Sequence, residues 1–288
     1  MTSTSTLLPL PPQLASFKEA LDQRLLSLVQ SLEPSSLSPV FEEILHGGKR
    51  LRPLLLLATA EGLGTSWSSA LEVACSLECL HLASLTCENA HHTTTHGSHR
   101  PSSTHTPHDL FVLSSQALVQ FAYEIVSNQE HLSPTCRLSL ISKMSHYAGG
   151  EQLIRGQVRQ LQLRVEDLSP DQIWEVHRLK TGSLMRCALE CASVLAHTSQ
   201  VTCKRLGLIG EELGIAHQLI EDILLMQTAA HSDHRRPPTI SAVEVLGVAL
   251  ARSQALQLLD HAAQRIRQEL RHPDHLLHLA ERLVHRLH

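Results

Sequence analysis

Two glycines and three cations crowd residues 47–53, which read Gly-Gly-Lys-Arg-Leu-Arg-Pro. Glycine lets the backbone approach an anion closely, Lys49 supplies a point charge, and the planar guanidinium of Arg52 suits the oxygens of a diphosphate. The same composition also occurs where a basic segment simply begins a helix. Taken alone, the motif leaves both interpretations open: a diphosphate-binding loop and a charged helix start.

Four further segments follow in order along the chain. Residues 77–85 read Leu-Glu-Cys-Leu-His-Leu-Ala-Ser-Leu, residues 156–157 Gly-Gln, residues 180–182 Lys-Thr-Gly, and residues 210–218 Gly-Glu-Glu-Leu-Gly-Ile-Ala-His-Gln. With the basic segment, these landmarks resemble the trans-isoprenyl diphosphate synthases, also called polyprenyl synthetases, over most of the chain. The resemblance implies an all-α, single-domain helical bundle of the isoprenoid synthase type that handles isoprenyl diphosphates.

The resemblance also implies roles for the residues at matching positions. Isopentenyl diphosphate would be held by Lys49, Arg52, His81 and Arg100. The allylic diphosphate would be held by Lys180, Thr181 and Gln218. The first arginine of the family's Arg-Arg pair is here His99, so the allylic set is incomplete, whereas the set for isopentenyl diphosphate is complete. On this pattern the chain can still bind isopentenyl diphosphate where it no longer catalyses prenyl transfer.

The first aspartate motif of the family is changed in this chain. Active members carry two adjacent aspartates, with a third a few residues on. Counting from His81 places Glu88 and Asn89 at the adjacent positions and either His92 or Thr94 at the third. One carboxylate of three survives, and Glu88 is the candidate metal ligand.

The second aspartate motif retains Glu221 and Asp222, but its third carboxylate position is Leu225. Magnesium takes oxygen ligands. Residues at i and i+4 share one helix face, so Glu221 and Leu225 would face the same site. Glu221 offers carboxylate oxygens to a metal ion there, whereas Leu225 offers none. Losing one stabiliser of the leaving diphosphate costs roughly 10²–10³ in rate. We expect impaired catalysis, with Mg²⁺ as a cofactor only if the chain is active; the metal candidates are Glu88, Glu221 and Asp222.

Ala83 and Ser84 precede the first motif, where the resemblance implies control of product length. The family uses an aromatic residue at this point to stop short products. Small side chains would leave a deep pocket between helices, consistent with a product of about geranylgeranyl length or longer. This expectation applies only if the chain is active.

Two cysteine pairs share an i, i+4 spacing, Cys75 with Cys79 and Cys187 with Cys191, among seven cysteines in all. Buried cysteines that pack as small apolar side chains are one interpretation, and metal or redox chemistry is another. A third comes from a partial resemblance to plant small subunits of geranyl and geranylgeranyl diphosphate synthases, whose Cys-x-x-x-Cys motifs serve pairing with a catalytic subunit. On that interpretation Cys187 and Cys191 are a possible subunit contact.

Residues 91–108 are rich in histidine, serine, threonine and proline, a composition that cannot pack a core. We interpret this segment as a solvated loop, because a defined zinc, nickel or copper site needs about four ligands in fixed geometry. A pH-sensitive lid over the site is the alternative, since imidazole changes charge near neutrality.

Apolar residues recur at intervals of three and four, which predicts helices. The predicted segments are 14–32, 70–85, 117–126, 173–195 and 206–226, with loops at 34–39, 101–107 and 237–238. Hydrophobic residues make up 42% of the chain but aromatic residues only 3%, so leucine and alanine must form the core. We predict a flexible segment over residues 1–12 and one polyprenyl synthetase-like domain over residues 13–288.

The net charge of −4 gives no electrostatic footprint for nucleic acid. No uninterrupted apolar stretch reaches the roughly 18 residues of a membrane span, so none is expected. We expect a cytoplasmic protein, the alternative being a plastid protein, because the beginning of the chain is rich in serine and threonine and free of acidic residues.

Three functions fit these observations. The first is a non-catalytic or regulatory subunit that forms a heterodimer with an active homologue, or a homodimer. The second is an active prenyltransferase, or a cyclase-like enzyme acting on prenyl diphosphates. The third is a histidine-rich metal binder. The lost carboxylates favour the first, whereas the retained cations Lys49, Arg52, Arg100 and Lys180 keep the second open.

Overall fold

The computed structural model describes residues 8–31, 37–45, 48–95, 108–164, 168–229 and 240–287, and every regular element in these ranges is a helix. The predicted all-α fold is confirmed. The elements in chain order are α1 (Pro12–Gln30), α2 (Ser38–Leu45), α3 (Leu51–Gly62), α4 (Trp67–Thr95), α5 (His108–Ser127), α6 (Pro134–Ala148), α7 (Leu153–Gln162), α8 (Pro170–His177), a π turn (Arg178–Gly182), α9 (Ser183–Leu195), α10 (Gln200–Ala229), α11 (Ala242–Leu246), α12 (Val248–Glu269) and α13 (Asp274–His285).

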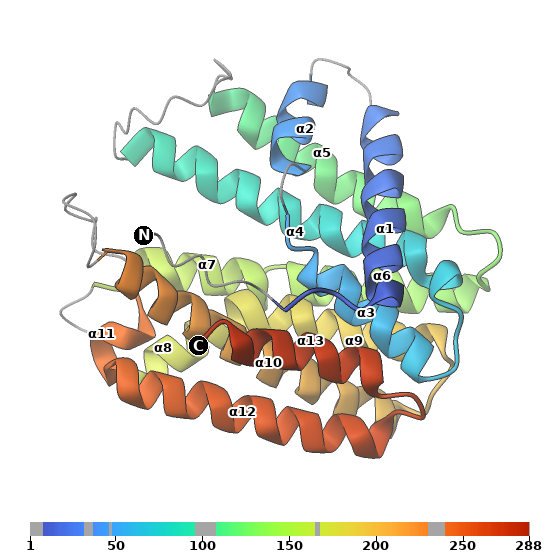
Figure 1. Cartoon of the computed structure of the whole chain (residues 1–288). Helices are drawn as coiled ribbons and strands as arrows, with labels where there is room; N and C mark the ends of the chain where they lie inside the picture. Colours follow the sequence, from blue (N-terminus) through green and yellow to red (C-terminus); the bar gives the residue numbers. More distant parts are fainter. Residues whose placement is uncertain are drawn as a thin grey trace.

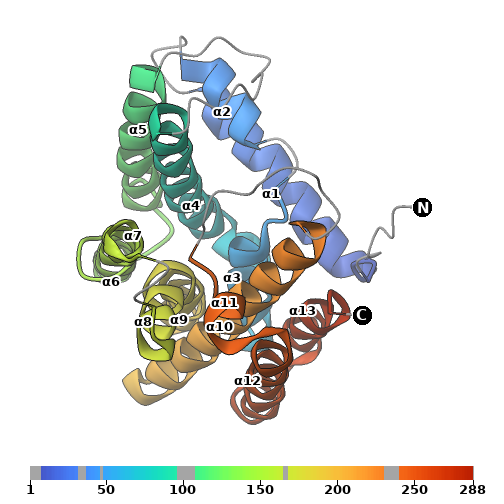
Figure 2. The ribbon, with the colours of Figure 1, turned by 90° about the vertical axis from the view of Figure 1, so that its left-hand side faces the viewer.

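A short helix, α3, lies at the centre of the bundle. Every residue from Pro53 to Ala60 is buried, so this helix has no solvent face. A helix that is apolar all round needs partners on every side. α4, α9 and α13 supply them (Figures 1 and 2). The basic segment leads directly into α3, and the core therefore fixes where that segment stands.

Helices α9 and α10 approach each other closely because glycines line their contact. A Cβ on Gly210 would lie 2.4 Å from the carbonyl oxygen of Met185, and a Cβ on Gly214 would lie 2.6 Å from the Cα of Gly182. These neighbours are backbone atoms, which cannot move aside as a side-chain tip can. The glycines in the landmark at 210–218 therefore serve packing.

The predicted helix at 173–195 is divided by the π turn into α8 and α9. Ser169 and Gln172 form a capping box at the start of α8, and Pro170 occupies its first turn, so this end is well specified. The π turn then interrupts the α-helical pattern at Arg178–Gly182. Such turns are often found at functional sites, and this one carries Lys180 and Thr181.

The other predicted runs fall on α1, α4, α5 and α10, although the first extends past the end of α1 at Gln30. Pro39, predicted in a loop, lies in the first turn of α2 instead, where proline is tolerated because its missing N–H has no helical partner. The loops predicted at 101–107 and 237–238 lie outside the described residues. α1 begins at Pro12, and the proposed domain boundary stays a prediction.

Two helical segments are long and apolar enough to cross a membrane by length and composition, which differs from our expectation of none. They are Trp67–Glu88, which is 67% buried inside the fold, and Asp109–Ser127, which is 33% buried. The first is a core helix of the bundle, and such helices pass the same test. This is weak evidence for a membrane span.

The contact between α9 and α10 yields a test of packing. The substitution Gly210→Ala forces the added methyl group against the backbone at Met185. We therefore expect the free energy of unfolding, measured by urea denaturation, to fall by about 1–3 kcal/mol. Gly150→Ala is the matched control, because a Cβ there meets nothing within 4 Å. Equal stability of the two variants would contradict this account.

Candidate functional site

The side chains of Lys49, Arg50 and Arg52 in the basic segment contact different parts of the fold. Arg50 has a left-handed backbone (φ 53°) at the start of α3, and only 5% of its surface is exposed. Its guanidinium donates to Asp22 of α1 at 2.7 Å, to Glu78 of α4 at 3.1 Å and to the carbonyl oxygen of Leu45. A Cβ on Gly48 would collide with this guanidinium, which explains the glycine. Arg50 is therefore a structural residue.

Arg52, on the first turn of α3, contacts His81 of α4. The Nη1 of Arg52 lies 3.0 Å from the Nε2 of His81, and because arginine can only donate, the imidazole nitrogen must accept. Burial holds the pKa of His81 well below its ordinary value, and the positive charge of Arg52 acts in the same direction. Burial lowers the pKa of Arg52, and the charges of Glu78, Glu88 and Glu221 oppose this shift.

Glu88, the surviving residue of the first motif, is held by two donors. Lys180 of the π turn lies 3.0 Å from its carboxylate, and the amide of Gln157 on α7 donates to it at 3.0 Å. Lys180 also donates to Gln160 at 3.0 Å, and Gln157 donates to Ser84 at 2.9 Å. Gln157 of the Gly-Gln landmark thus links Glu88 of the first motif to α7.

Asp222 is 4% exposed and fully engaged. It accepts from the backbone N–H of Ala242 at 2.7 Å and from the amide of Gln218 at 3.0 Å, and it lies 3.3 Å from the Nε2 of His177. The hydroxyl of Thr181 donates to Gln218 at 2.8 Å. Asp222 therefore connects α10 to α8 and to the start of α11, rather than facing open space.

Glu221, its neighbour on α10, faces three basic groups. Lys49 donates to its Oε1 at 2.9 Å, Arg286 just after α13 donates to the same oxygen, and the Nε2 of His217 lies 3.6 Å from it. Burial alone would raise the pKa of Glu221, but the hydrogen bond from Arg286 and the contacts with His217 and Lys49 lower it to about 2. Glu221 is thus an ionised partner of protein cations.

We call Lys49, Arg52, His81, Glu88, Lys180, His217 and Glu221 the charged site. A pocket of about 50 Å³, open to solvent, adjoins it between α3, α10 and α13. Its polar lining consists of Lys49, His217, Arg282 and Arg286, with leucines of α3 and α13 between them. Arg282 and Arg286 were missed by sequence reasoning, although their i, i+4 spacing on an amphipathic C-terminal helix was a usable signal.

The residues present do not fit a magnesium ion as they stand. Glu88 and Glu221 are both paired with protein cations, Asp222 is saturated by donors, and Leu225 is 46% exposed where a third carboxylate would stand. Among the described residues, no group of three His, Cys, Asp or Glu side chains is placed to hold a metal ion. The side chain of Asn89 lies outside the described part of the chain.

The structure shows where the two residues predicted to control product length lie. Ala83 is 2% exposed and its carbonyl accepts from Ser115 of α5 at 2.9 Å, so it packs against α5, while Ser84 is half-buried beside Gln157. The predicted deep pocket at this point stays a prediction. Arg100, His99 and residues 96–107 of the histidine-rich segment lie outside the described residues. Residues 91–95 continue α4 and His108 begins α5, so the predicted loop is wrong at its two described ends.

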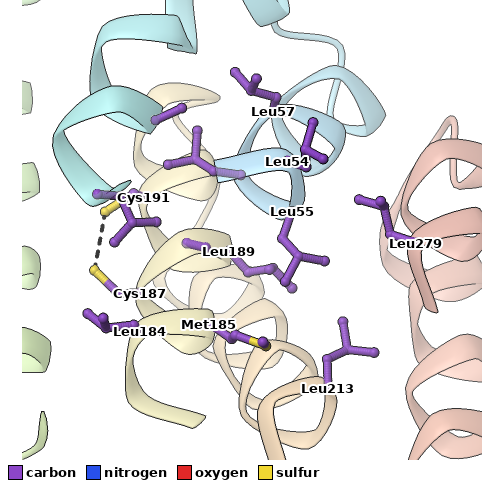
Figure 3. Packing of buried hydrophobic residues seen from close by; sticks show 14 of the residues in the cluster. Leu54, Leu55, Leu57, Leu184, Met185, Cys187, Leu189, Cys191, Leu213 and Leu279 are labelled. Atoms are coloured by element: carbon purple, nitrogen blue, oxygen red, sulfur yellow. Dashed lines mark hydrogen bonds between the residues drawn. The ribbon is translucent and has the colours of Figure 1, made fainter. Parts of the chain in front are cut away.

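The paired cysteines lie in the core. Cys187 and Cys191 have no exposed surface, and their sulfur atoms are 3.8 Å apart among leucines of α3 and α9 (Figure 3). The hydrogen bond with Cys191 and burial raise the pKa of Cys187 well above its usual range. Cys75 and Cys79 are buried as well. In the folded chain these side chains act as small apolar groups, and a partner would have to touch other atoms of α9.

The sequence profile of a family described as polyprenyl synthetase matches residues 100–237. A farnesyl diphosphate synthase of Geobacillus stearothermophilus is 28% identical over 221 residues, 74% of each chain. A dimethylallyltranstransferase of Fischerella ambigua is 27% identical over 97% of this chain and 84% of the relative.

Solved structures agree with this fold. An apo FPP/GFPP synthase from Zymomonas mobilis superposes with a TM-score of 0.79 at 26% identity, covering 94% of this chain and 99% of that one. A geranyltransferase from Helicobacter pylori, complexed with magnesium and isoprenyl diphosphate, gives a TM-score of 0.73 at 23% identity, covering 97% and 98%.

The buried imidazole of His217 predicts a pH dependence of stability. Burial lowers the pKa of His217 to about 3, with the charges of Arg52, Arg286 and Lys49 in support and Glu221 in opposition. Between pH 6.5 and 3 the unfolded chain binds a proton that the folded chain refuses, so stability falls as the pH falls. We expect His217→Phe to remove up to about 3 kcal/mol of this loss at pH 4.

The measurement is the urea midpoint from pH 7 to pH 4 for wild type, His217→Phe and the exposed control His131→Phe. A profile of His217→Phe parallel to that of the wild type would show that this imidazole does not govern the acid sensitivity.

Proposed function

The chain belongs to the polyprenyl synthetase family, and on that basis we propose that it binds isoprenyl diphosphates at the charged site, is impaired in prenyl transfer, and pairs as a non-catalytic or regulatory subunit with an active prenyl diphosphate synthase. Leu225 carries this proposal. It stands one helical turn after Glu221 on the same face and offers a hydrocarbon where a third carboxylate would help to hold metal ions.

Retained cations support binding of the diphosphate. Lys49 is half-exposed, Arg52 lies beside His81, and Lys180 projects from the π turn. Ammonium and guanidinium groups bind diphosphate oxygens through charge-assisted hydrogen bonds. Binding of isopentenyl diphosphate involves no ionisation of the ligand, so this half of the family's chemistry needs fewer carboxylates than prenyl transfer does.

An apolar face supports the proposed pairing. α5 has a mean hydropathy of 1.3 over Asp109–Ser127, yet only 33% of that stretch is buried. Val112 and Leu113 on α5 and Leu138 on the adjacent α6 are exposed, Leu138 by 68% and Leu113 by 53%. Exposed apolar patches of this kind mark protein interfaces. We propose that this face meets the partner subunit.

An active prenyltransferase is the second candidate, and the relatives favour it. Those most similar include proteins named farnesyl diphosphate synthase and geranylgeranyl diphosphate synthase. Under this alternative, Mg²⁺ serves as cofactor, Glu88, Glu221 and Asp222 exchange their protein partners for metal, and Ala83 and Ser84 leave room for a product of about geranylgeranyl length or longer.

A prenyl transfer assay separates the two candidates. The purified chain is incubated with magnesium, labelled isopentenyl diphosphate and each allylic diphosphate, and we expect no extractable prenyl product while binding of isopentenyl diphosphate is measurable. Product that disappears in Lys180→Ala but persists in Lys204→Ala, an exposed control on α10, would overturn the impairment and establish the enzyme.

The apolar face predicts the behaviour of one surface variant. Leu113→Glu places a charge in the proposed interface, so we expect loss of the complex with an active geranylgeranyl diphosphate synthase, or of the homodimer, by light scattering after gel filtration. Leu26→Glu on α1 is the matched control, because Leu26 is 44% exposed away from this face. A chain that is monomeric and makes no complex with the synthase would refute the pairing.

A further inference from the structure

Glu221 stands where a family member would present a metal ligand, yet its surroundings are those of a counter-ion. Its Oε1 receives hydrogen bonds from Lys49 and from Arg286 and lies 3.6 Å from His217. The three groups come from different elements: the segment before α3, the residue after α13, and α10 itself. The carboxylate therefore joins three parts of the fold at one oxygen.

The negative charge of Glu221 is already neutralised by cations of the protein itself. A divalent ion at the same carboxylate would lie beside the full positive charges of Lys49 and Arg286, which repel it. Leu225, on the same face, gives it no second ligand, and Asp222 is occupied by Ala242, Gln218 and His177. The donor set disfavours a metal ion at Glu221.

The cations around Glu221 outnumber it. Arg282 also lines the adjoining cavity, and the described residues offer it no acceptor. Arg286 is largely buried, with 10% of its side chain exposed, whereas Lys49 is 53% exposed and free to change partners. A diphosphate at the mouth of this cavity would meet these three cations beside the carboxylate of Glu221, which neutralises part of their charge and repels the ligand.

We propose that Glu221 is an internal anion that competes with diphosphate for Lys49 and Arg286, and that diphosphate binding by this chain is not strengthened by magnesium. This inference rests on the proposed function, because it assumes that the charged site binds diphosphate. It assigns Glu221 the opposite role from a metal ligand: removing its charge opens the site to the ligand.

The test is calorimetric titration of the full chain with inorganic diphosphate, in EDTA and again in magnesium chloride. Glu221→Gln keeps the size of the side chain and removes its charge. We expect this variant to bind diphosphate about tenfold more tightly than the wild type in EDTA, because two partly buried ion pairs no longer compete. We expect magnesium not to tighten the wild-type affinity.

Glu212→Gln is the matched control. Glu212 lies on the same helix but pairs with Arg265 and His261 at the contact with α12, so its replacement changes the net charge equally without touching the site. We expect its affinity to equal that of the wild type. A tenfold gain in both variants would indicate a general charge effect and overturn the inference.

The remaining outcomes separate this inference from the function on which it rests. Wild-type binding that is tightened by magnesium and loses this gain in Glu221→Gln would make Glu221 a metal ligand. Binding that is equal in wild type and Glu221→Gln would overturn the competition but leave the proposed function standing. No binding of diphosphate or isopentenyl diphosphate by either protein, both folded by circular dichroism, would end both proposals.

Discussion

The buried guanidinium of Arg50 is the interaction on which the site depends. It draws together α1 through Asp22, α4 through Glu78 and the end of α2 through the carbonyl of Leu45, and it does so from the residue that begins the central helix α3. Removing one partner of a buried ion pair typically costs about 3–5 kcal/mol. The left-handed backbone of Arg50 is tolerated because these three acceptors compensate for it. Lys49 and Arg52 flank this fixed residue and are thereby directed toward the charged site.

The charged site is a set of internal ion pairs rather than an array of free ligands. Lys180 neutralises Glu88 from the π turn, while Lys49 before α3 and Arg286 after α13 neutralise Glu221. The cations of this site thus outnumber its carboxylates, which suits an anionic ligand. The overall fold is that of the solved prenyl synthase structures, and in this chain the carboxylates of the site are satisfied by the protein's own cations.

Sequence reasoning predicted the fold class and most of the long helices, because apolar periodicity is a local signal that α1, α4, α5 and α10 display clearly. It passed over α3, since a helix buried on all sides has no polar face to reveal its period. The motifs located Lys49, Arg52, His81, Glu88, Lys180, Gln218 and Glu221, which the structure brings together. Sequence could not show that Arg50 turns inward or that Arg286 reaches Glu221, because both depend on contacts between residues far apart in the chain.

The π turn at Arg178–Gly182 has a consequence for how this chain tolerates changes in length. A π turn contains one residue more than the α-helical turn it replaces. Deleting a single residue here would let α8 and α9 join as one regular helix and would keep the two flanking segments close to their present directions, because the wider turn absorbs the extra residue. The residues of the turn itself would be displaced, so Lys180 would leave Glu88 and Thr181 would leave Gln218. The additional residue thus serves the contacts of the turn rather than the alignment of the two helices, and a deletion here would remove those contacts while leaving the helix packing in place.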